Sequence, residues 1–181
     1  MGEIRYSRMK KETFIFLAIL CFFACSDSKY ESAENVAELT ISFNDPSWDG
    51  ADVPKRGQCT NCGGEGLSPP LLVKNIPENA DVLIVEFKDK TMNVFHGAIR
   101  FPISEKMEFV IPSVQEQTMD LPPGAELESV HNAPIGGPGA YMAPCGCGYR
   151  NKYVATIRAL KSENSGQKLL LGKGKIKLGR F

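Results

Sequence analysis

The chain has 181 residues, with 21 basic and 21 acidic side chains and a formal net charge of zero at pH 7. This balance excludes a strongly basic protein of the kind that binds nucleic acid through a positive surface, so we expect no nucleic-acid partner. The length suits one domain of ordinary size with a core of its own.

The N-terminal residues 1–24 have the pattern of an export signal. Four basic side chains within residues 1–11 precede an apolar stretch at 13–24, which is shorter than the roughly 20 residues of a membrane-spanning helix. The small residue Ala24 then precedes Cys25, as at the cleavage site of a bacterial lipoprotein. We expect Cys25 to become the lipidated N-terminus and the protein to reside in the cell envelope, facing the periplasm or in the outer membrane. Ordinary secretion with an unmodified Cys25 is the alternative.

Removal of the signal would leave a slightly acidic chain. Residues 1–24 hold four basic and two acidic side chains, so 17 basic and 19 acidic ones remain and the net charge is near −2. Residues 25–38 are polar, acidic and aperiodic, and we expect them to form a tether between the lipid and a folded domain at 39–181.

The folded part has the periodicity of strands. Alternating or continuous apolar runs predict strands at 38–43, 81–87, 94–101 and 153–160, with weaker candidates at 108–111 and 175–178. Proline and glycine separate these runs, and no window of a dozen residues has a helical apolar face. We therefore expect an all-β sandwich or barrel with few or no helices beyond the signal peptide.

Four cysteines form two close pairs, Cys59 with Cys62 and Cys145 with Cys147. Such pairs form either two disulfides or one four-cysteine metal site. Disulfides are the usual state in an exported chain, and we expect them here without a cofactor. A zinc site remains an alternative, because Cys-x2-Cys is a good half of one. A redox-active Cys59–Cys62 pair is a weaker one, because glycines and not a helix follow it.

Six motifs, in order over about residues 40–181, resemble those of the phosphatidylethanolamine-binding protein (PEBP) family, which includes the Raf kinase inhibitor proteins. The family's Cys-Asp-Gly-Glu-Asn-x-Ser-Pro-Pro-Leu run is similar to Cys62-Gly-Gly-Glu-Gly-Leu-Ser-Pro-Pro-Leu. The other matching segments are Ile76-Pro-Glu-Asn-Ala, Phe95-His-Gly, Leu121-Pro-Pro-Gly-Ala, Tyr141-Met-Ala-Pro-Cys and Asn151-Lys-Tyr. The resemblance implies a Greek-key β-sandwich of the PEBP type.

The resemblance also implies a pocket near one end of the sandwich that binds anions and phosphorylated head groups. The family builds this pocket from an aspartate motif, a histidine in Trp-His-Trp, a Gly-Pro turn and a His-Arg-Tyr segment. Carried over by position, the candidate ligand-binding residues are His96, Tyr153, Pro144, Tyr141, Asn151, Lys88 and Asp89.

Three departures alter the chemistry expected of this pocket. Asn151 replaces the family's second histidine, so it can donate a hydrogen bond but carries no charge. Lys88 and Asp89 stand where the acidic motif belongs; Lys88 would supply positive charge, and Asp89 would orient the imidazole of His96. A short segment at 161–168 replaces a family helix beside the pocket, so we expect a pocket that is more open or that has lost its ligand.

These features together predict a membrane-anchored binding protein for a small anionic or phosphorylated ligand, such as a phospholipid head group. No catalytic triad, phosphate-binding loop or paired-carboxylate signature appears, so we expect no enzyme. One alternative is a protein-interaction or inhibitor domain with a decayed pocket, and a second is a structural zinc-binding domain built on the four cysteines.

The resemblance finally implies how the cysteines pair. The Cys59/Cys62 and Cys145/Cys147 segments correspond to pocket-side loops that approach each other in the family fold, so we expect two bridges between them, Cys62–Cys145 and Cys59–Cys147. Each would close a loop of about eighty residues, which in the chain-entropy model removes roughly 4 kcal/mol of freedom from the unfolded chain.

Overall fold

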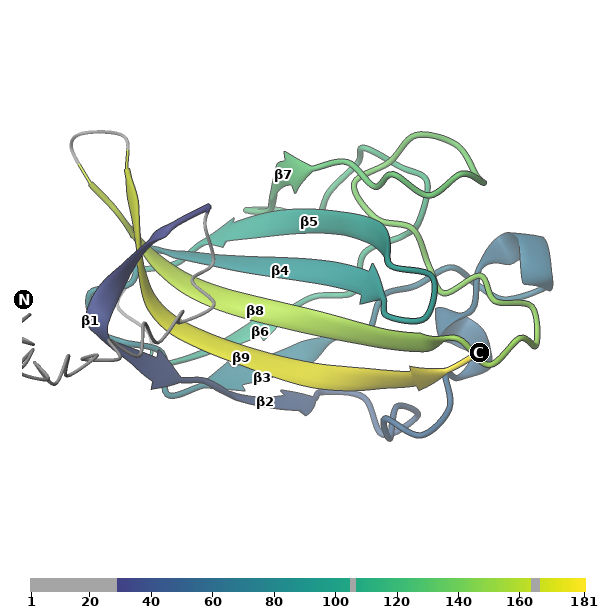
Figure 1. Cartoon of the computed structure of the whole chain (residues 1–181), viewed down its shortest axis with the longest axis horizontal. Coiled ribbons are helices and arrows are strands. Elements are labelled where there is room, and N and C mark those ends of the chain that lie inside the picture. The colour runs from purple at the N-terminus through teal and green to yellow at the C-terminus, as the bar shows by residue number, and fades with distance from the viewer. Residues whose placement is uncertain (1–28, 105–106, 164–166) are drawn as a thin grey trace, which may run out of the picture.

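The computed structural model describes residues 29–104, 107–163 and 167–181. The expected signal peptide and Cys25 lie outside these ranges. The described residues form a sandwich of a six-stranded and a three-stranded sheet (Figure 1). The strands are β1 (Glu31–Glu38), β2 (Thr40–Phe43), β3 (Leu71–Lys74), β4 (Val82–Asp89), β5 (Val94–Pro102), β6 (Glu108–Ile111), β7 (Glu126–Ser129), β8 (Lys152–Ser162) and β9 (Lys168–Arg180).

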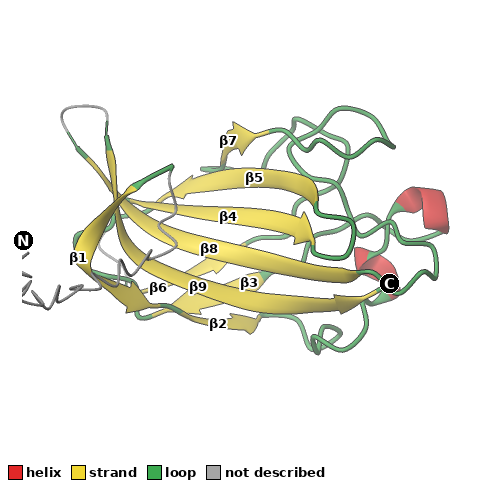
Figure 2. Cartoon of the chain, viewed as in Figure 1, coloured by secondary structure: helices red, strands yellow, loops and turns green. Residues whose placement is uncertain are grey.

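The large sheet has the order β1-β9-β8-β4-β5-β7, and the small sheet has the order β2-β3-β6. All neighbouring strands are antiparallel except β1, which runs parallel to β9. Two 3₁₀ turns, η1 (Lys55–Gly57) and η2 (Thr60–Cys62), are the helical elements within the described ranges; Figure 2 shows both at the end of the sandwich that holds the C-terminus. The expected all-β fold is confirmed. No helix in this part of the chain combines the length and apolar character needed to cross a bilayer.

The main core lies between the two sheets, and the central strand β4 shows how the sequence builds it. Leu83, Val85 and Phe87 point into the core, whereas Val82 and Ile84 belong to a smaller cluster on the other face of the large sheet. Because side chains of a strand alternate between faces, a strand that is covered on both sides is apolar throughout. The same alternation places the side chains of Lys88 and Asp89, the last two residues of β4, on opposite faces of the sheet.

The expected strands at 81–87, 94–101, 108–111 and 153–160 are confirmed as β4, β5, β6 and β8. The expected strand at 175–178 is part of the much longer β9, and β3 and β7 were not predicted. The tether expected at 25–38 is contradicted over Glu31–Glu38, which forms the edge strand β1. Most side chains of β1 are exposed, so the sequence of this strand has no alternating apolar pattern that would predict its pairing with β9.

Candidate ligand pocket

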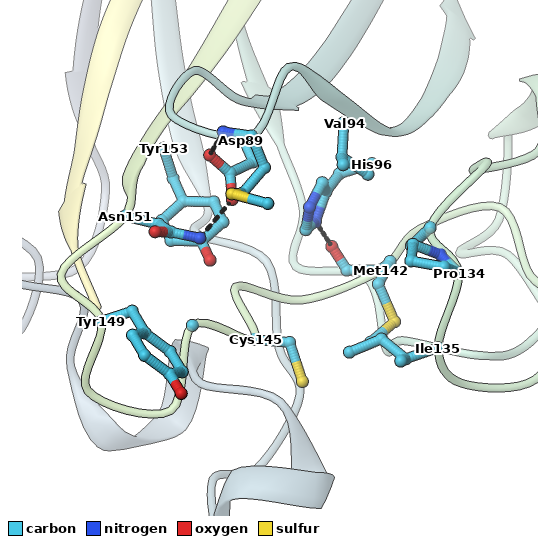
Figure 3. A pocket seen from close by; sticks show the side chains of 13 residues that line it. Asp89, Val94, His96, Pro134, Ile135, Met142, Cys145, Tyr149, Asn151 and Tyr153 are labelled. Atoms are coloured by element: carbon cyan, nitrogen blue, oxygen red, sulfur yellow. Dashed lines mark hydrogen bonds between the residues drawn. The ribbon is translucent and has the colours of Figure 1, made fainter.

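A pocket of about 510 Å³ lies at one end of the sandwich, where β4 ends and β5 and β8 begin. Figure 3 shows Asp89, Asn151 and Tyr153 on one side of it and His96 with Met142 on another. The polar lining residues Asp89, His96 and Asn151 are among the candidates that the family resemblance implied, and Tyr153 joins them.

Asp89 is the last residue of β4 and is almost fully buried. Its Oδ1 accepts hydrogen bonds from the backbone N–H groups of Thr91 (2.7 Å) and Met92 (3.0 Å). Its Oδ2 accepts a hydrogen bond of 2.8 Å from Nδ2 of Asn151. The carboxylate therefore holds the β4–β5 turn and the Asn151 side chain in one arrangement, as buried charged groups require several donors.

His96 on β5 is held by the backbone of Met142. Nδ1 of His96 lies 2.7 Å from the Met142 carbonyl oxygen, and the Met142 N–H donates to the His96 carbonyl at 2.9 Å. A carbonyl only accepts, so Nδ1 carries the proton and Nε2 of the neutral ring is an acceptor. Within the described residues Nε2 has no hydrogen-bond partner. The expectation that Asp89 orients this ring is not what the structure has, because the Met142 carbonyl holds it.

Burial determines the protonation of the two aromatic pocket groups. Burial lowers the pKa of His96 below its usual value, so the imidazole is neutral at pH 7. Burial also raises the pKa of Tyr153 to about 12, and its hydroxyl stays protonated beside Asp89 and Asn151. The two rings pack edge to face, with centroids 5.5 Å apart and an interplanar angle of 75°.

Gly97 allows the 140–142 segment to approach β5 at this point. Its φ is +106°, and a Cβ atom there would overlap the carbonyl oxygen of Ala140. A side chain at position 97 would therefore push away the segment that carries the Met142 carbonyl.

Three other candidates do not line the pocket. Lys88 lies on the opposite face of β4 from Asp89, because successive side chains of a strand alternate. Tyr141 is fully buried in the core, packed edge to face on Phe87 with centroids 4.7 Å apart. Pro144 is buried, and its carbonyl accepts the backbone N–H of Cys59 at 2.9 Å. The roles expected for these residues as ligand contacts are not supported by their positions.

The apolar walls of the pocket were not predicted. Apart from Val94, the first residue of β5, they come from loops with no periodic pattern: Met92, Pro134, Ile135, Met142 and Tyr149. Three of these are strongly exposed for apolar side chains: Tyr149 at 88%, Met92 at 64% and Ile135 at 46%. They form an apolar rim at the mouth of the pocket, a feature that sequence periodicity cannot reveal.

The disulfides join the two expected segments, but the cysteines pair differently from the prediction. The structure has Cys59–Cys145 and Cys62–Cys147, so the expected pairs Cys62–Cys145 and Cys59–Cys147 are wrong. The reason is local: the backbone N–H of Cys59 donates to the Pro144 carbonyl, which places Cys59 beside Cys145. The turn η2 then carries Cys62 away, toward the exposed Cys147. Cys145 also lines the pocket, so one bridge supports the pocket wall.

Glu116 holds the same two segments together through hydrogen bonds, and the sequence analysis did not predict this role. This buried carboxylate accepts hydrogen bonds from the backbone N–H and hydroxyl of Thr60, both at 2.7 Å, and from the backbone N–H of Ala143 at 3.2 Å. A lone glutamate in a loop usually lies in solvent, so nothing in the sequence marked it.

The fold and the pocket together define a β-sandwich with a small ligand-sized cavity at one end. The sequence matches no established family model. A UPF0098 protein of Chlamydia pneumoniae is 27% identical over 113 residues, covering 61% of this chain and 69% of that protein.

Solved structures of two proteins are similar to this chain. Escherichia coli YbcL, described as a member of the mammalian PEBP family, superposes with a TM-score of 0.54 at 18% identity, covering 80% of this chain and 98% of that one. A PEBP homologue from Chlamydia trachomatis gives a TM-score of 0.49 at 18% identity, covering 81% and 98%. The likeness to YbcL confirms the resemblance seen in the motifs at the level of the fold: this chain has the fold of the PEBP family.

Proposed function

We propose that this domain is a binding protein that holds a small anionic or phosphorylated ligand, such as a phospholipid head group, in the His96 pocket. One observation carries the proposal: the polar side chains of Asp89, His96 and Asn151 line, from two sides, a cavity of about 510 Å³ whose other walls are mostly apolar. A concave apolar cavity with a few convergent polar groups is the usual form of a small-molecule site.

The polar groups suit a phosphate monoester that shares a proton with the pocket. No Lys or Arg is among the described lining residues, so His96 is the group there that can become cationic. An approaching anion favours protonation of Nε2, which then donates a charge-assisted hydrogen bond to it. A phosphate monoester has a second pKa of about 6, so a singly protonated form is accessible and can donate to the Asp89 carboxylate.

Calorimetry tests this function with inorganic phosphate and phosphorylethanolamine on the purified protein. We expect weak but saturable binding of both, since the pocket offers one titratable cation. His96→Asn is the matched variant: its amide can replace the Nδ1 donor to Met142 but presents nothing at the position of Nε2. Loss of one charge-assisted hydrogen bond should weaken binding about tenfold or more. Absence of binding by the folded wild type at millimolar ligand would refute the proposal.

We also infer that the protein is exported and anchored to a membrane of the cell envelope through lipid on Cys25. The basic start, the short apolar stretch and Ala24-Cys25 support this. Labelling of cells with a radioactive fatty acid should mark the wild type and leave Cys25→Ser unmarked. A Cys25→Ser protein that is processed and membrane-bound as usual would contradict the anchor.

The exposed rim of Met92, Ile135 and Tyr149 favours a second candidate function, a protein-interaction or inhibitor domain that binds a partner across the pocket mouth. Tyr149→Ser separates the two candidates. It should leave phosphate binding nearly unchanged if the small ligand is the function. If binding of a protein partner is the function, Tyr149→Ser should abolish capture of that partner, and phosphate should not compete with the partner for the wild type.

A further inference from the structure

The two disulfides are packed against each other. The Sγ atoms of Cys59, Cys62, Cys145 and Cys147 all lie within 4.8 Å of one another. Between the bridges, Sγ of Cys62 lies 3.3 Å from Sγ of Cys59 and 3.7 Å from Sγ of Cys145. Two disulfides that only staple loops need no such mutual contact.

The spacing of the four sulfur atoms is close to that of a tetrahedral metal site. Zinc binds thiolates at about 2.3 Å, which places the sulfur atoms of a tetrahedron about 3.8 Å apart. Two of the distances between the bridges, 3.3 and 3.7 Å, are already near this value, and none of the four sulfur atoms lies more than 4.8 Å from another, so the main change would be the separation of the two bonded pairs. The backbone would need to move little for such a change.

Contacts other than the bridges keep the two segments together. The Cys59 N–H donates to the Pro144 carbonyl, and Glu116 binds both Thr60 and Ala143. The Cys-x2-Cys turn is closed on itself by hydrogen bonds from the N–H groups of Cys62 and Gly64 to the Cys59 carbonyl, both at 3.0 Å. None of these contacts involves a sulfur atom, so we expect them to keep the thiols facing one another when the disulfides open.

We propose that the reduced form of this cluster binds one zinc ion through the four cysteines. Each disulfide takes two electrons and two protons from a dithiol reductant, which becomes a disulfide itself. The four thiols then lose their protons as thiolates bind zinc. Thiolate ligands in tetrahedral array select zinc over the hard cations. The site borders the pocket of the proposed function, because Cys145 lines that pocket, but its chemistry uses neither His96 nor Asp89.

The burial of the four residues sets the order of events. Cys59 is fully buried, Cys62 and Cys145 are partly buried, and Cys147 is exposed. The Cys62–Cys147 bridge is therefore the one that a reductant reaches first. Its opening frees the Cys62 thiolate beside the second bridge. Attack of this thiolate on the Cys59–Cys145 bond forms a new disulfide to Cys62 and releases one thiolate, and a second dithiol then reduces the new disulfide.

The test uses the full chain, oxidised and after reduction by a dithiol without oxygen. We expect no zinc in the oxidised protein and one zinc per chain in the reduced protein, measured by native mass spectrometry after removal of excess metal. Cobalt in place of zinc should give the charge-transfer and visible bands of a tetrahedral tetrathiolate. Cys147→Ser should weaken zinc binding about tenfold or more, because the loss of a ligand should cost at least as much affinity as the loss of a residue that only hydrogen-bonds to a ligand. The matched control Asn61→Ser, at an exposed position in the same turn, should bind zinc like the wild type.

Circular dichroism and thermal melting make every outcome decisive. If reduction leaves the β fold intact, failure to bind zinc overturns the proposal. If reduction unfolds the chain, zinc should restore the fold, because binding of a structural metal is coupled to folding. Zinc that neither binds nor restores the fold overturns the proposal equally, as does a Cys147→Ser variant with wild-type affinity. Phosphate binding by the oxidised protein is measured in parallel, and its presence or absence bears only on the proposed function.

Discussion

His96 and Met142 bind each other in both directions: Nδ1 of the imidazole donates to the Met142 carbonyl at 2.7 Å, and the Met142 N–H donates to the His96 carbonyl at 2.9 Å. The pair joins β5 to the segment that closes the pocket and fixes one tautomer of the ring. Nε2 is therefore an acceptor before any ligand arrives. A backbone carbonyl, which cannot titrate, does the orienting work that a carboxylate would otherwise do.

The pH dependence of stability should reveal the buried neutral state of His96. Burial lowers the pKa of the folded His96 below the unfolded value of about 6.5. Below about pH 6.5 the unfolded chain binds a proton there that the folded chain does not, so this residue makes stability fall as pH falls toward the folded pKa. Urea unfolding between about pH 7.5 and 5.5 should therefore show a steeper loss in the wild type than in His96→Asn. Equal slopes would contradict the assignment.

Phosphate should oppose this loss. An anion that binds beside Nε2 raises the pKa of His96, so affinity should increase as pH falls toward the lowered pKa of the ligand-free folded protein, and the slope of stability against pH should flatten with ligand present. Calorimetry at several pH values should show proton uptake on binding, which differs between buffers of different ionisation enthalpy. Binding that weakens as pH falls would exclude this arrangement.

Replacing Asn151 by histidine should strengthen anion binding. Asn151 donates to Asp89 at 2.8 Å, and an imidazole there can keep that bond while gaining a charge. We expect phosphate affinity to rise about tenfold near pH 6, in line with one added charge-assisted hydrogen bond. Asn151→Ala is the control; it removes the donor to the buried carboxylate and should lower both affinity and melting temperature. Weaker phosphate binding by Asn151→His than by the wild type would count against this placement.

Gly97→Ala should disrupt the pocket wall. Its Cβ would overlap the Ala140 carbonyl oxygen, and its φ of +106° disfavours any side chain. Gly124→Ala is the matched control, because Gly124 has a φ of +78° with no atom within 4 Å of the added Cβ. Gly124→Ala measures backbone strain of about 1 kcal/mol, and Gly97→Ala should cost about 2 kcal/mol more. If urea unfolding showed equal losses of stability for Gly97→Ala and Gly124→Ala, the 140–142 segment would be able to move away from β5 at no cost in free energy.

Glu116→Gln should loosen the loops that carry the cysteines. The glutamine oxygen can serve Thr60, but its amide group then meets the Ala143 N–H donor, so one buried hydrogen bond is lost. We expect a loss of about 1–3 kcal/mol in the free energy of unfolding. Glu78→Gln, at an exposed position, should change it by less than about 0.5 kcal/mol. A loss no greater than that of the control would show that Glu116 does not clamp these loops.

Most of the large sheet could be predicted because its strands carry their own burial pattern. Residues 81–87 and 153–160 are apolar runs of central strands, and each appears as a strand of the structure within two residues at either end. The edge strand β1 was missed because exposed polar side chains make it resemble a tether. Its strand conformation depends on hydrogen bonds to β9, at the other end of the chain.

The sequence by itself determined the strand-rich fold and the two cysteine segments, and its resemblance to the PEBP family implied the pocket positions of Asp89, His96, Asn151 and Tyr153. Only the tertiary structure decided that Lys88 faces away from the pocket, that Tyr141 lies in the core, and which cysteines pair. The physical reason is the range of the interactions. Strand periodicity reflects which side of a short segment is buried, a property of neighbouring residues. Disulfide partners and pocket walls depend on how segments some eighty residues apart meet, where a turn such as η2 redirects a sulfur atom by a few ångströms and so decides which thiol it reaches.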